Sequence, residues 1–452
     1  MITFIIIAFL VGYLGIALEH TLKTNKAATA LLLASVLWVA YIFYAPQIGR
    51  SIEQVLNVDI IENLGDASQT LFFLLGAMTV VELIDIHGGF SIITDRITTK
   101  NKRKLLWVIS LLTFFLSAIL DNLTTTIVMV MLLRKLIADK SDRWLFASMV
   151  VLAANAGGAW SPIGDVTTIM LWIRGNVTTG HLIPKLILPS LTAMIVPLAV
   201  VSYSLHGNIS TPEKTAERAM HPAATIISNK QRKKIFFFGI CALIFVPIFK
   251  SITHLPPFIG ILFGLSLLWI YTDFIYYRMK QVDEAKKARI SSVLSRVDTP
   301  TILFFLGILM AVAVLKLSGI LDAFSTYLDN TIGDYRLITL IIGFISSIVD
   351  NVPLVAGAIG MYDVAPIPAE GLSMLNPDLL PYIQDGAFWL FLTYCAGVGG
   401  SILIIGSAAG VVAMGIEGID FIWYLKRISW LAAIGYLSGA AVFLLEQMIF
   451  AI

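Results

Sequence analysis

Long apolar runs separated by short polar stretches fill most of the 452-residue chain. A helix needs about 20 predominantly apolar residues to cross the hydrocarbon core of a bilayer. Runs of about this length recur along the whole sequence, and we therefore expect an all-α polytopic membrane protein. The ten predicted spans cover residues 2–20, 27–45, 67–86, 145–174, 183–205, 235–250, 257–277, 300–317, 386–416 and 425–450.

Two further apolar stretches, 105–137 and 336–362, do not fit as single spans because they are too long. Each carries an Asp-Asn pair near its middle, Asp121-Asn122 in the first and Asp350-Asn351 in the second. Backbone leaves helical geometry at membrane depth only where protein or a water-filled cavity surrounds it. We therefore predict two re-entrant helical hairpins with an Asp-Asn pair at each tip.

The distribution of lysine and arginine supports this topology. Cytoplasmic loops of membrane proteins carry an excess of these residues. With both hairpins re-entrant, all the rich loops fall on one side of the membrane and both termini lie outside. Counting either hairpin as a span would break this alternation. Most of the 31 lysine and arginine residues lie in 19–27, 87–104, 134–144, 206–234, 278–298 and 417–427, whereas 46–66 has one and 363–385 has none.

The two halves of the chain also resemble each other in three ordered matches. Residues 71–90 parallel 302–321, SAILDN at 117–122 parallels SSIVDN at 346–351, and GGAWSPIGD at 157–165 parallels GGSILIIGS at 399–407. Five predicted spans plus one hairpin per half make the second half inverted. Inverted repeats with paired broken helices are typical of secondary transporters whose site lies near the midplane.

This pattern predicts a division of the chain into three parts. The first repeat covers 1–205 and the second 235–452, and each contains one discontinuous helix at the midplane. A basic cytoplasmic connector joins them at 206–234. The hairpins are 105–137 and 336–362, and the broken helices are 145–174 and 386–416.

Three aspartates lie in the predicted breaks: Asp121, Asp165 and Asp350. A charged side chain at the bilayer centre costs roughly 2.5–3.5 kcal/mol on insertion scales, so we expect these three to bind an ion or a proton. Helix capping is the alternative, although serine or asparagine would cap without a charge. Back-bonding to their own helix is the alternative for the threonines. Amide and hydroxyl groups around the aspartates are Asn122, Thr124, Thr125, Asn155, Thr167, Thr168, Asn351, Ser401 and Ser407.

Oxygen ligands of this kind suit a hard cation such as sodium. No lysine or arginine lies in the four predicted breaks, whereas an organic anion would need a basic group there. One carboxylate holds either a proton or a sodium ion, so exchange follows if the carrier reorients only when that carboxylate is neutralised. We therefore predict a carrier without enzyme activity or cofactor. The predicted sodium ligands are Asp121, Asn122, Asn155 and Asp165.

Glu82, Asp85 and His87 are weaker candidates near the cytoplasmic end of the third span, where exposure at the membrane interface is the simpler interpretation.

Four stretches of the sequence carry a family resemblance. SAILDNLTTTIVMV, NAGGAWSPIGDVTTIMLW, SSIVDNVP and GVGGSILIIGSAAGV resemble the NhaD-type sodium/proton antiporters of the ion transporter superfamily, whose relatives carry arsenite, citrate and dicarboxylates. The resemblance covers nearly the whole chain. By motif match it assigns function to Asp121, Asn122, Asn155, Asp165, Thr167, Thr168, Asn351, Ser401 and Ser407.

The resemblance implies a homodimer in the bacterial inner membrane that exchanges sodium, often also lithium, for protons at alkaline pH. It also implies a scaffold domain and a moving transport domain, in an elevator-type mechanism. The alternative is a sodium-coupled symporter of an organic anion or oxyanion, in which the aspartates hold only the coupling sodium. A basic side chain facing the site would favour that alternative.

Overall fold

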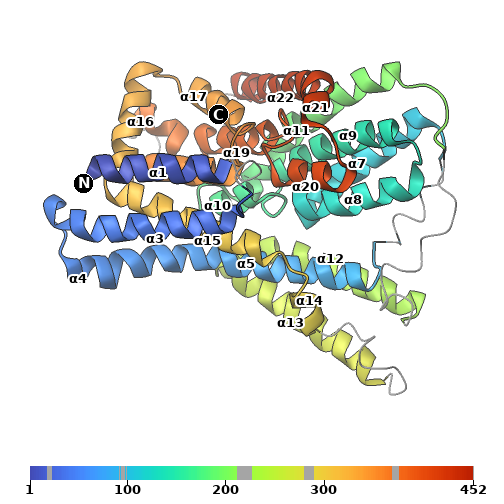
Figure 1. The fold of residues 1–452 in the computed structure, drawn as a ribbon, viewed down its shortest axis with the longest axis horizontal. Coiled ribbons are helices and arrows are strands. Elements are labelled where there is room, and N and C mark those ends of the chain that lie inside the picture. Colours follow the sequence, from blue (N-terminus) through green and yellow to red (C-terminus); the bar gives the residue numbers. More distant parts are fainter. Residues whose placement is uncertain are drawn as a thin grey trace.

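In the part of the chain that the computed structural model describes, the regular secondary structure is helical, apart from two isolated bridges. The described residues are 1–17, 23–90, 92, 97, 99–210, 227–278, 290–368 and 376–450. Most helices lie along the long dimension of the molecule (Figure 1). The longer ones are α1 (Ile2–Ala17), α3 (Lys26–Tyr44), α5 (Ile60–Ile86), α7 (Lys102–Leu120), α8 (Asn122–Leu136), α9 (Lys140–Ala159), α11 (Thr179–Ser204), α12 (Asn229–Thr253), α13 (Pro257–Arg278), α15 (Thr299–Leu317), α16 (Ile320–Thr331), α19 (Ala387–Gly399) and α22 (Ser429–Phe450).

Within the described residues, 8 helices are long and apolar enough to cross a membrane, or up to 9 if one bent pair counts as a span. All but one of the eight overlap predicted spans. The exception is α7, which belongs to the first predicted hairpin and has the length of a span by itself. Of the predicted span at 2–20, the described part is the helix α1 (Ile2–Ala17).

Each predicted break in a helix is present. The first hairpin stretch divides at Asp121, and the second at residues 346–350. Both long glycine-containing stretches divide into two helices around an irregular segment. The second helices of these four pairs are α8 (Asn122–Leu136), α18 (Asn351–Met361), α10 (Val166–Ile173) and α20 (Ala408–Glu417), which follow α7, α17 (Tyr335–Ile345), α9 and α19.

The polar stretch 46–66 was predicted as a loop, and this was wrong for most of its length. Helical structure begins at Ile52 and runs into α5. Ser51 starts it with a capping box to Gln54, which satisfies backbone groups that would otherwise lack partners. The buried Asp59 is neutralised there, because it contacts Arg50 and accepts a 3.0 Å hydrogen bond from the Tyr41 hydroxyl.

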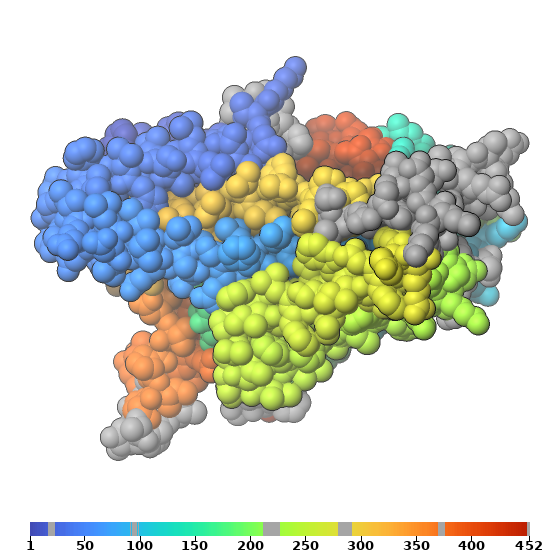
Figure 2. Space-filling model, turned by 90° about the horizontal axis from the view of Figure 1, so that it is seen from below, coloured from blue at the N-terminus to red at the C-terminus, as the bar shows by residue number. Residues whose placement is uncertain are grey.

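The helices pack in two groups, and each group draws on both halves of the chain. The first helix group contains α1, α3, α5, α12, α13 and α15, and the second contains α7–α11, α17–α20 and α22. The first group makes up most of the lower side of the molecule in Figure 1, which Figure 2 shows from below. Contacts of α15 with α18 and of α10 with α5 join the two groups. The broken helices thus lie in one group and meet the other along one side.

Three predicted polar segments lie partly outside the described residues: the connector 206–234, the charged loop 278–298, and the stretch 363–385. The sequence predicts 363–385 as an external insertion after the second hairpin, because it has no counterpart in the first half. The described end of the insertion contains the 3-10 helix η6 (Pro377–Tyr382). After it, Gln384 donates to the backbone oxygen of Gly175 at 2.7 Å, and Asp385 accepts hydrogen bonds from Thr178. The described end of the insertion therefore docks on the segment that follows α10.

Candidate functional site

Asp165 is the centre of a buried polar cluster, the central cluster, formed by Asn122, Asn155, Asp165, Asn351, Ser401 and Ser407. Its side chain is 1% exposed and caps the N-terminus of α10. One carboxylate oxygen, Oδ1, accepts from the backbone N–H and the hydroxyl of Thr167, both at 3.0 Å. Thr168 completes the capping box through its hydroxyl and the backbone of Asp165. The cap therefore uses only one of the two carboxylate oxygens.

Both tip asparagines converge on this one carboxylate. Asn122 donates from Nδ2 to Asp165 Oδ2 at 2.7 Å and to Asn155 Oδ1 at 3.0 Å. Asn351 Nδ2 lies 3.5 and 3.4 Å from the two oxygens of Asp165. The two tip asparagines, 229 positions apart in the sequence, thus meet at a single acidic group.

Asn155 connects the first half of the chain to the second. Its Nδ2 donates to Ser401 Oγ at 2.9 Å and to Ser407 Oγ at 2.8 Å, and the side chain is fully buried. Ser407 caps α20 with φ −141°, as Asp165 caps α10 with φ −146°. The two caps hold matching positions, but only the first carries a charge.

A pair of buried hydrogen bonds also occurs in both halves. Ser117 Oγ donates to the backbone oxygen of Ala154 at 2.6 Å, and Ser346 Oγ donates to that of Ala396 at 3.0 Å. Both serines come from the aligned SAILDN and SSIVDN motifs. Each bond ties the first helix of a predicted hairpin to the first helix of a broken pair.

The aligned glycines let these helices cross closely. A Cβ atom on Gly157 would overlap the backbone oxygen of Phe114, and a Cβ atom on Gly399 would overlap that of Gly343. Protein interiors are close-packed, so such a clash cannot be absorbed without moving the backbone. The glycine repeats therefore mark two equivalent crossings beside the central cluster.

Asp121 stands apart from the central cluster. It caps α8 with a positive φ of 81°, which is uncommon for a residue other than glycine. Its two oxygens accept from the backbone N–H and the hydroxyl of Thr124 at 2.7 and 2.8 Å. Among the described residues it makes no hydrogen bond to Asn155 or Asp165. Of the four predicted sodium ligands, the structure joins Asn122, Asn155 and Asp165 by hydrogen bonds, whereas Asp121 binds Thr124 instead.

Asp350 has a partner that the sequence did not suggest. It caps α18 through Val352 N, 3.3 Å from Oδ1, and its Oδ2 accepts from Lys26 Nζ at 2.8 Å. The Lys26 ammonium also lies 4.5 Å from the centre of the Phe304 ring. Lys26 opens α3 and was assigned to a polar loop, so no signal in the sequence connected it with Asp350.

The structure supports parts of both interpretations of the aspartates and threonines, ion binding and helix capping. All three aspartates cap helices, as the alternative predicted, but Asp165 Oδ2 is left for the asparagines. Thr167 turns its hydroxyl to Asp165 rather than to its own helix. The buried Thr125 hydroxyl has no hydrogen-bond partner among the described residues.

The weaker candidates near the end of α5 differ in their exposure. His87 is buried rather than exposed at an interface, with Nε2 2.7 Å from the hydroxyl of Tyr276. Glu82 pairs with Arg296 across 3.3 Å and is partly exposed.

Comparison with known proteins places the chain among membrane transporters. The sequence model of the citrate transporter (CitMHS) family matches residues 4–383. Sodium/proton antiporter 1 of Arabidopsis thaliana is 45% identical over 96% of this chain and 71% of its own length. Sodium/proton antiporter 2 of the same plant is 44% identical over 96% and 97%. The Na⁺/H⁺ antiporter NhaD of Vibrio cholerae serotype O1 is 31% identical over 97% and 91%.

These matches extend over nearly the whole chain, and the matched family and relatives are transporters rather than enzymes. The helices long enough to cross a membrane agree with that class. The chain therefore belongs to the citrate transporter (CitMHS) family, together with the NhaD-type sodium/proton antiporters whose motifs it shares.

Proposed function

We propose that this protein is a secondary transporter that exchanges Na⁺ for H⁺, and that Asp165 is the residue that binds both. The observation that carries the proposal is the buried Asp165 carboxylate, whose described side-chain neighbours are the neutral Asn122, Thr167 and Asn351. No lysine or arginine contacts it in the described part of the chain. The relatives named as sodium/proton antiporters support the same ion pair.

The geometry suggests where the ion would bind. Asn122 Nδ2 bridges Asp165 Oδ2 and Asn155 Oδ1, so both oxygens lie within reach of one small group. A sodium ion in place of that NH₂ group would meet both oxygens, and Asn122 would turn its own amide oxygen toward the ion. A proton bound to Asp165 would neutralise the carboxylate in place of the sodium ion. Because one ion excludes the other, alternating occupancy couples their movements. No cofactor takes part in this exchange.

The proposal includes inverted repeats at 1–205 and 235–452, with re-entrant hairpins and an elevator-type movement. The repeated serine bonds and glycine crossings support the repeats. The division into two helix groups, with every broken helix in the second, supports movement of that group against the first.

The membrane and the assembly state complete the proposal. The lysine- and arginine-rich stretches support cytoplasmic loops and both termini outside. The resemblance to NhaD-type antiporters supports a homodimer, lithium as a second cation and the bacterial inner membrane. Relatives with 45% and 44% identity occur in a plant, so membrane fractionation of the native organism is the test of location.

Everted vesicles test the exchange directly. An imposed pH gradient should collapse when Na⁺ is added without any organic solute, and Asp165→Asn should abolish the response while the protein still inserts. Asp322→Asn, which removes an exposed carboxylate on α16, is the matched control. If Na⁺ does not collapse the gradient at any pH between 7 and 10, or if Asp165→Asn exchanges at a near-normal rate, the proposal is wrong.

The alternative function has one observation in its favour. Lys26 brings an ammonium group to Asp350 beside the central cluster, and the matched family model carries the name of citrate transport. A sodium-coupled symporter would take up labelled citrate only with Na⁺ present. Na⁺-driven proton movement without citrate would exclude this function as the principal one.

A further inference from the structure

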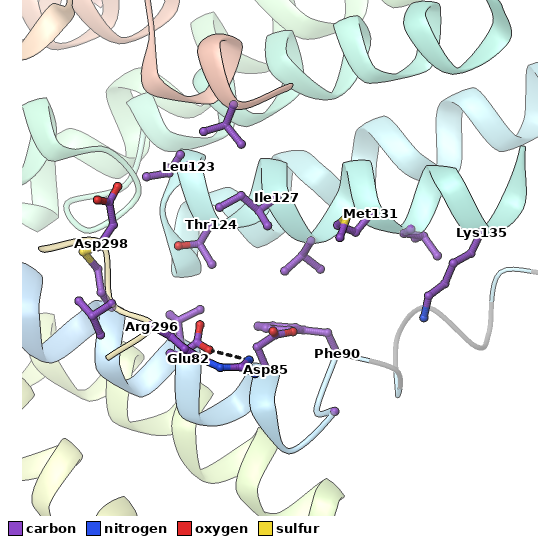
Figure 3. A pocket seen from close by; sticks show the side chains of 17 residues that line it. Glu82, Asp85, Phe90, Leu123, Thr124, Ile127, Met131, Lys135, Arg296 and Asp298 are labelled. Carbon is purple, nitrogen blue, oxygen red and sulfur yellow. Dashed lines mark hydrogen bonds and ion pairs between the residues drawn. The ribbon is translucent and has the colours of Figure 1, made fainter. Parts of the chain in front are cut away.

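A cavity of about 390 Å³ lies between the C-terminal part of α5 and α8, and the segment 296–298 closes one side (Figure 3). Its walls are largely apolar, with Val81 from α5 and Ile127 and Met131 from α8. The cavity lies between the two helix groups. It is separate from the central cluster, none of whose residues lines it.

The polar groups of this cavity are mostly acidic. Glu82, Asp85 and Asp298 supply three carboxylates, whereas Lys135 and Arg296 supply two cations. Glu82 Oε1 lies 3.3 Å from Arg296 NH1, and their side chains are 22% and 43% exposed. Figure 3 shows this pair on the α5 side of the cavity, opposite the side chains of α8.

The two ends of the cavity differ. At one end is Thr124, whose hydroxyl donates to Asp121 at the first hairpin tip. At the other are Phe90 and Lys135, which belong to two of the lysine- and arginine-rich stretches, 87–104 and 134–144 (Figure 3). By the positive-inside rule those stretches face the cytoplasm. The cavity thus leads from that face to the tip.

We propose that this cavity is the cytoplasmic vestibule for small monovalent cations, and that Glu82 is its cation-selecting residue. The proposal rests on the proposed function in two respects: the transported ion is a cation, and the lysine- and arginine-rich stretches face the cytoplasm. Carboxylates in a cleft with apolar walls concentrate the local field and raise the local cation concentration. Arg296 masks Glu82 until a cation competes for the carboxylate, so removal of either partner should change the selectivity in opposite directions.

Cysteine accessibility tests the vestibule without measuring transport. Ile127→Cys is made in a Cys241→Ala background, because Cys241 is the exposed native thiol and Cys395 is buried. Everted vesicles are treated with the cationic reagent methanethiosulfonate ethyltrimethylammonium or the anionic reagent methanethiosulfonate ethylsulfonate. Met131→Cys, on the same wall, serves if Ile127→Cys does not fold. Tyr203→Cys, 86% exposed at the end of α11, is the control outside the cavity.

After correction for each reagent's rate with a free thiol, we expect at least a 10-fold preference for the cationic reagent at Ile127→Cys and little preference at Tyr203→Cys. Glu82→Gln should reduce the preference at least 3-fold, and Arg296→Gln should increase it. Equal rates for both reagents, indifference to Glu82→Gln, or labelling only from the opposite membrane face would overturn the vestibule. Labelling does not require exchange, so the two tests are independent. A negative labelling result would not affect the test of Asp165, and a negative exchange result would not affect the labelling result.

Discussion

Lys26 donates to Asp350 across 2.8 Å, although 324 residues separate the two. Lys26 belongs to the first helix group, whereas Asp350 caps a helix of the second. The next residue, Asn351, approaches both oxygens of Asp165. The ion pair therefore links the first helix group to the surroundings of the buried carboxylate.

This pair gives a reciprocal prediction. Lys26→Gln removes the positive charge beside Asp350, so the negative charge of Asp350 is no longer balanced near Asp165. That charge makes the site attract protons more strongly, and the pH of half-maximal exchange should therefore rise by about 1 unit. Asp350→Asn removes a negative charge beside the Lys26 ammonium and should lower that pH by a similar amount. The double variant should return close to the original profile. Exchange in proteoliposomes between pH 6 and 10 measures all three.

A surface pair provides the control for this series. Lys316 and Asp363 lie 2.6 Å apart, but Asp363 is 83% exposed, and exposed pairs contribute little. Lys316→Gln should leave the pH profile unchanged. If the Lys26 and Asp350 single variants behave like Lys316→Gln, or if the double variant shows no recovery, the pair does not act on the site.

Asn155→Ala should weaken sodium binding and stability together. It removes three buried hydrogen bonds, to Asn122, Ser401 and Ser407, and each orphaned buried group costs about 1–3 kcal/mol. We expect at least a 10-fold rise in the KM for Na⁺ and a lower Tm in detergent. Asn330→Ala, on the exposed face of α16, should change neither. An unchanged KM in Asn155→Ala would show that the bridge between the halves is not needed for ion binding.

The close helix crossings at the glycines predict that a glycine-to-alanine substitution changes stability by an amount that depends on its position. Gly157→Ala and Gly399→Ala would each press a Cβ against a backbone oxygen, and overpacking typically costs about 1–3 kcal/mol. Both should lower the Tm and the yield of monodisperse protein. A Cβ on Gly357 or Gly415 has nothing within 4 Å, so Gly357→Ala and Gly415→Ala should be neutral or slightly stabilising. Equal behaviour of the four variants would contradict the crossing geometry.

Glu417 should be the most costly carboxylate to remove outside the site. It is fully buried and contacts Nε of Arg143 at 2.9 Å and Nε of Arg134 at 3.2 Å, which joins α20 to α8 and α9. Breaking a buried ion pair typically costs about 3–5 kcal/mol, so Glu417→Gln should lower the Tm strongly. Arg134→Gln should matter less, because Arg134 is half exposed. Asp66→Asn removes an exposed partner of Arg174 and should have little effect on the same melting curve.

The breaks were predictable because they leave local signals. An Asp-Asn pair or a double glycine inside an apolar run has few explanations, and all four breaks are present. Three of the four predicted sodium ligands, Asn122, Asn155 and Asp165, lie together because they flank those breaks, whereas Asp121 does not join them. Lys26 gave no such signal, since its role depends on helices that meet only in the folded chain. Helical structure at 52–59 was missed because its polar residues are typical of a loop when the buried partner of Asp59 is unknown.

Asn155 uses both protons of its amide on serines from the far half of the chain, so its orientation is fixed and its oxygen faces Asn122. Neither half of the chain, expressed alone, can form these hydrogen bonds. A chain cut within the connector should bind the ion only after the two fragments reassociate. We therefore expect Asn155 and its two serines to behave as one unit, so that a substitution at any of the three is tolerated only together with changes at the others.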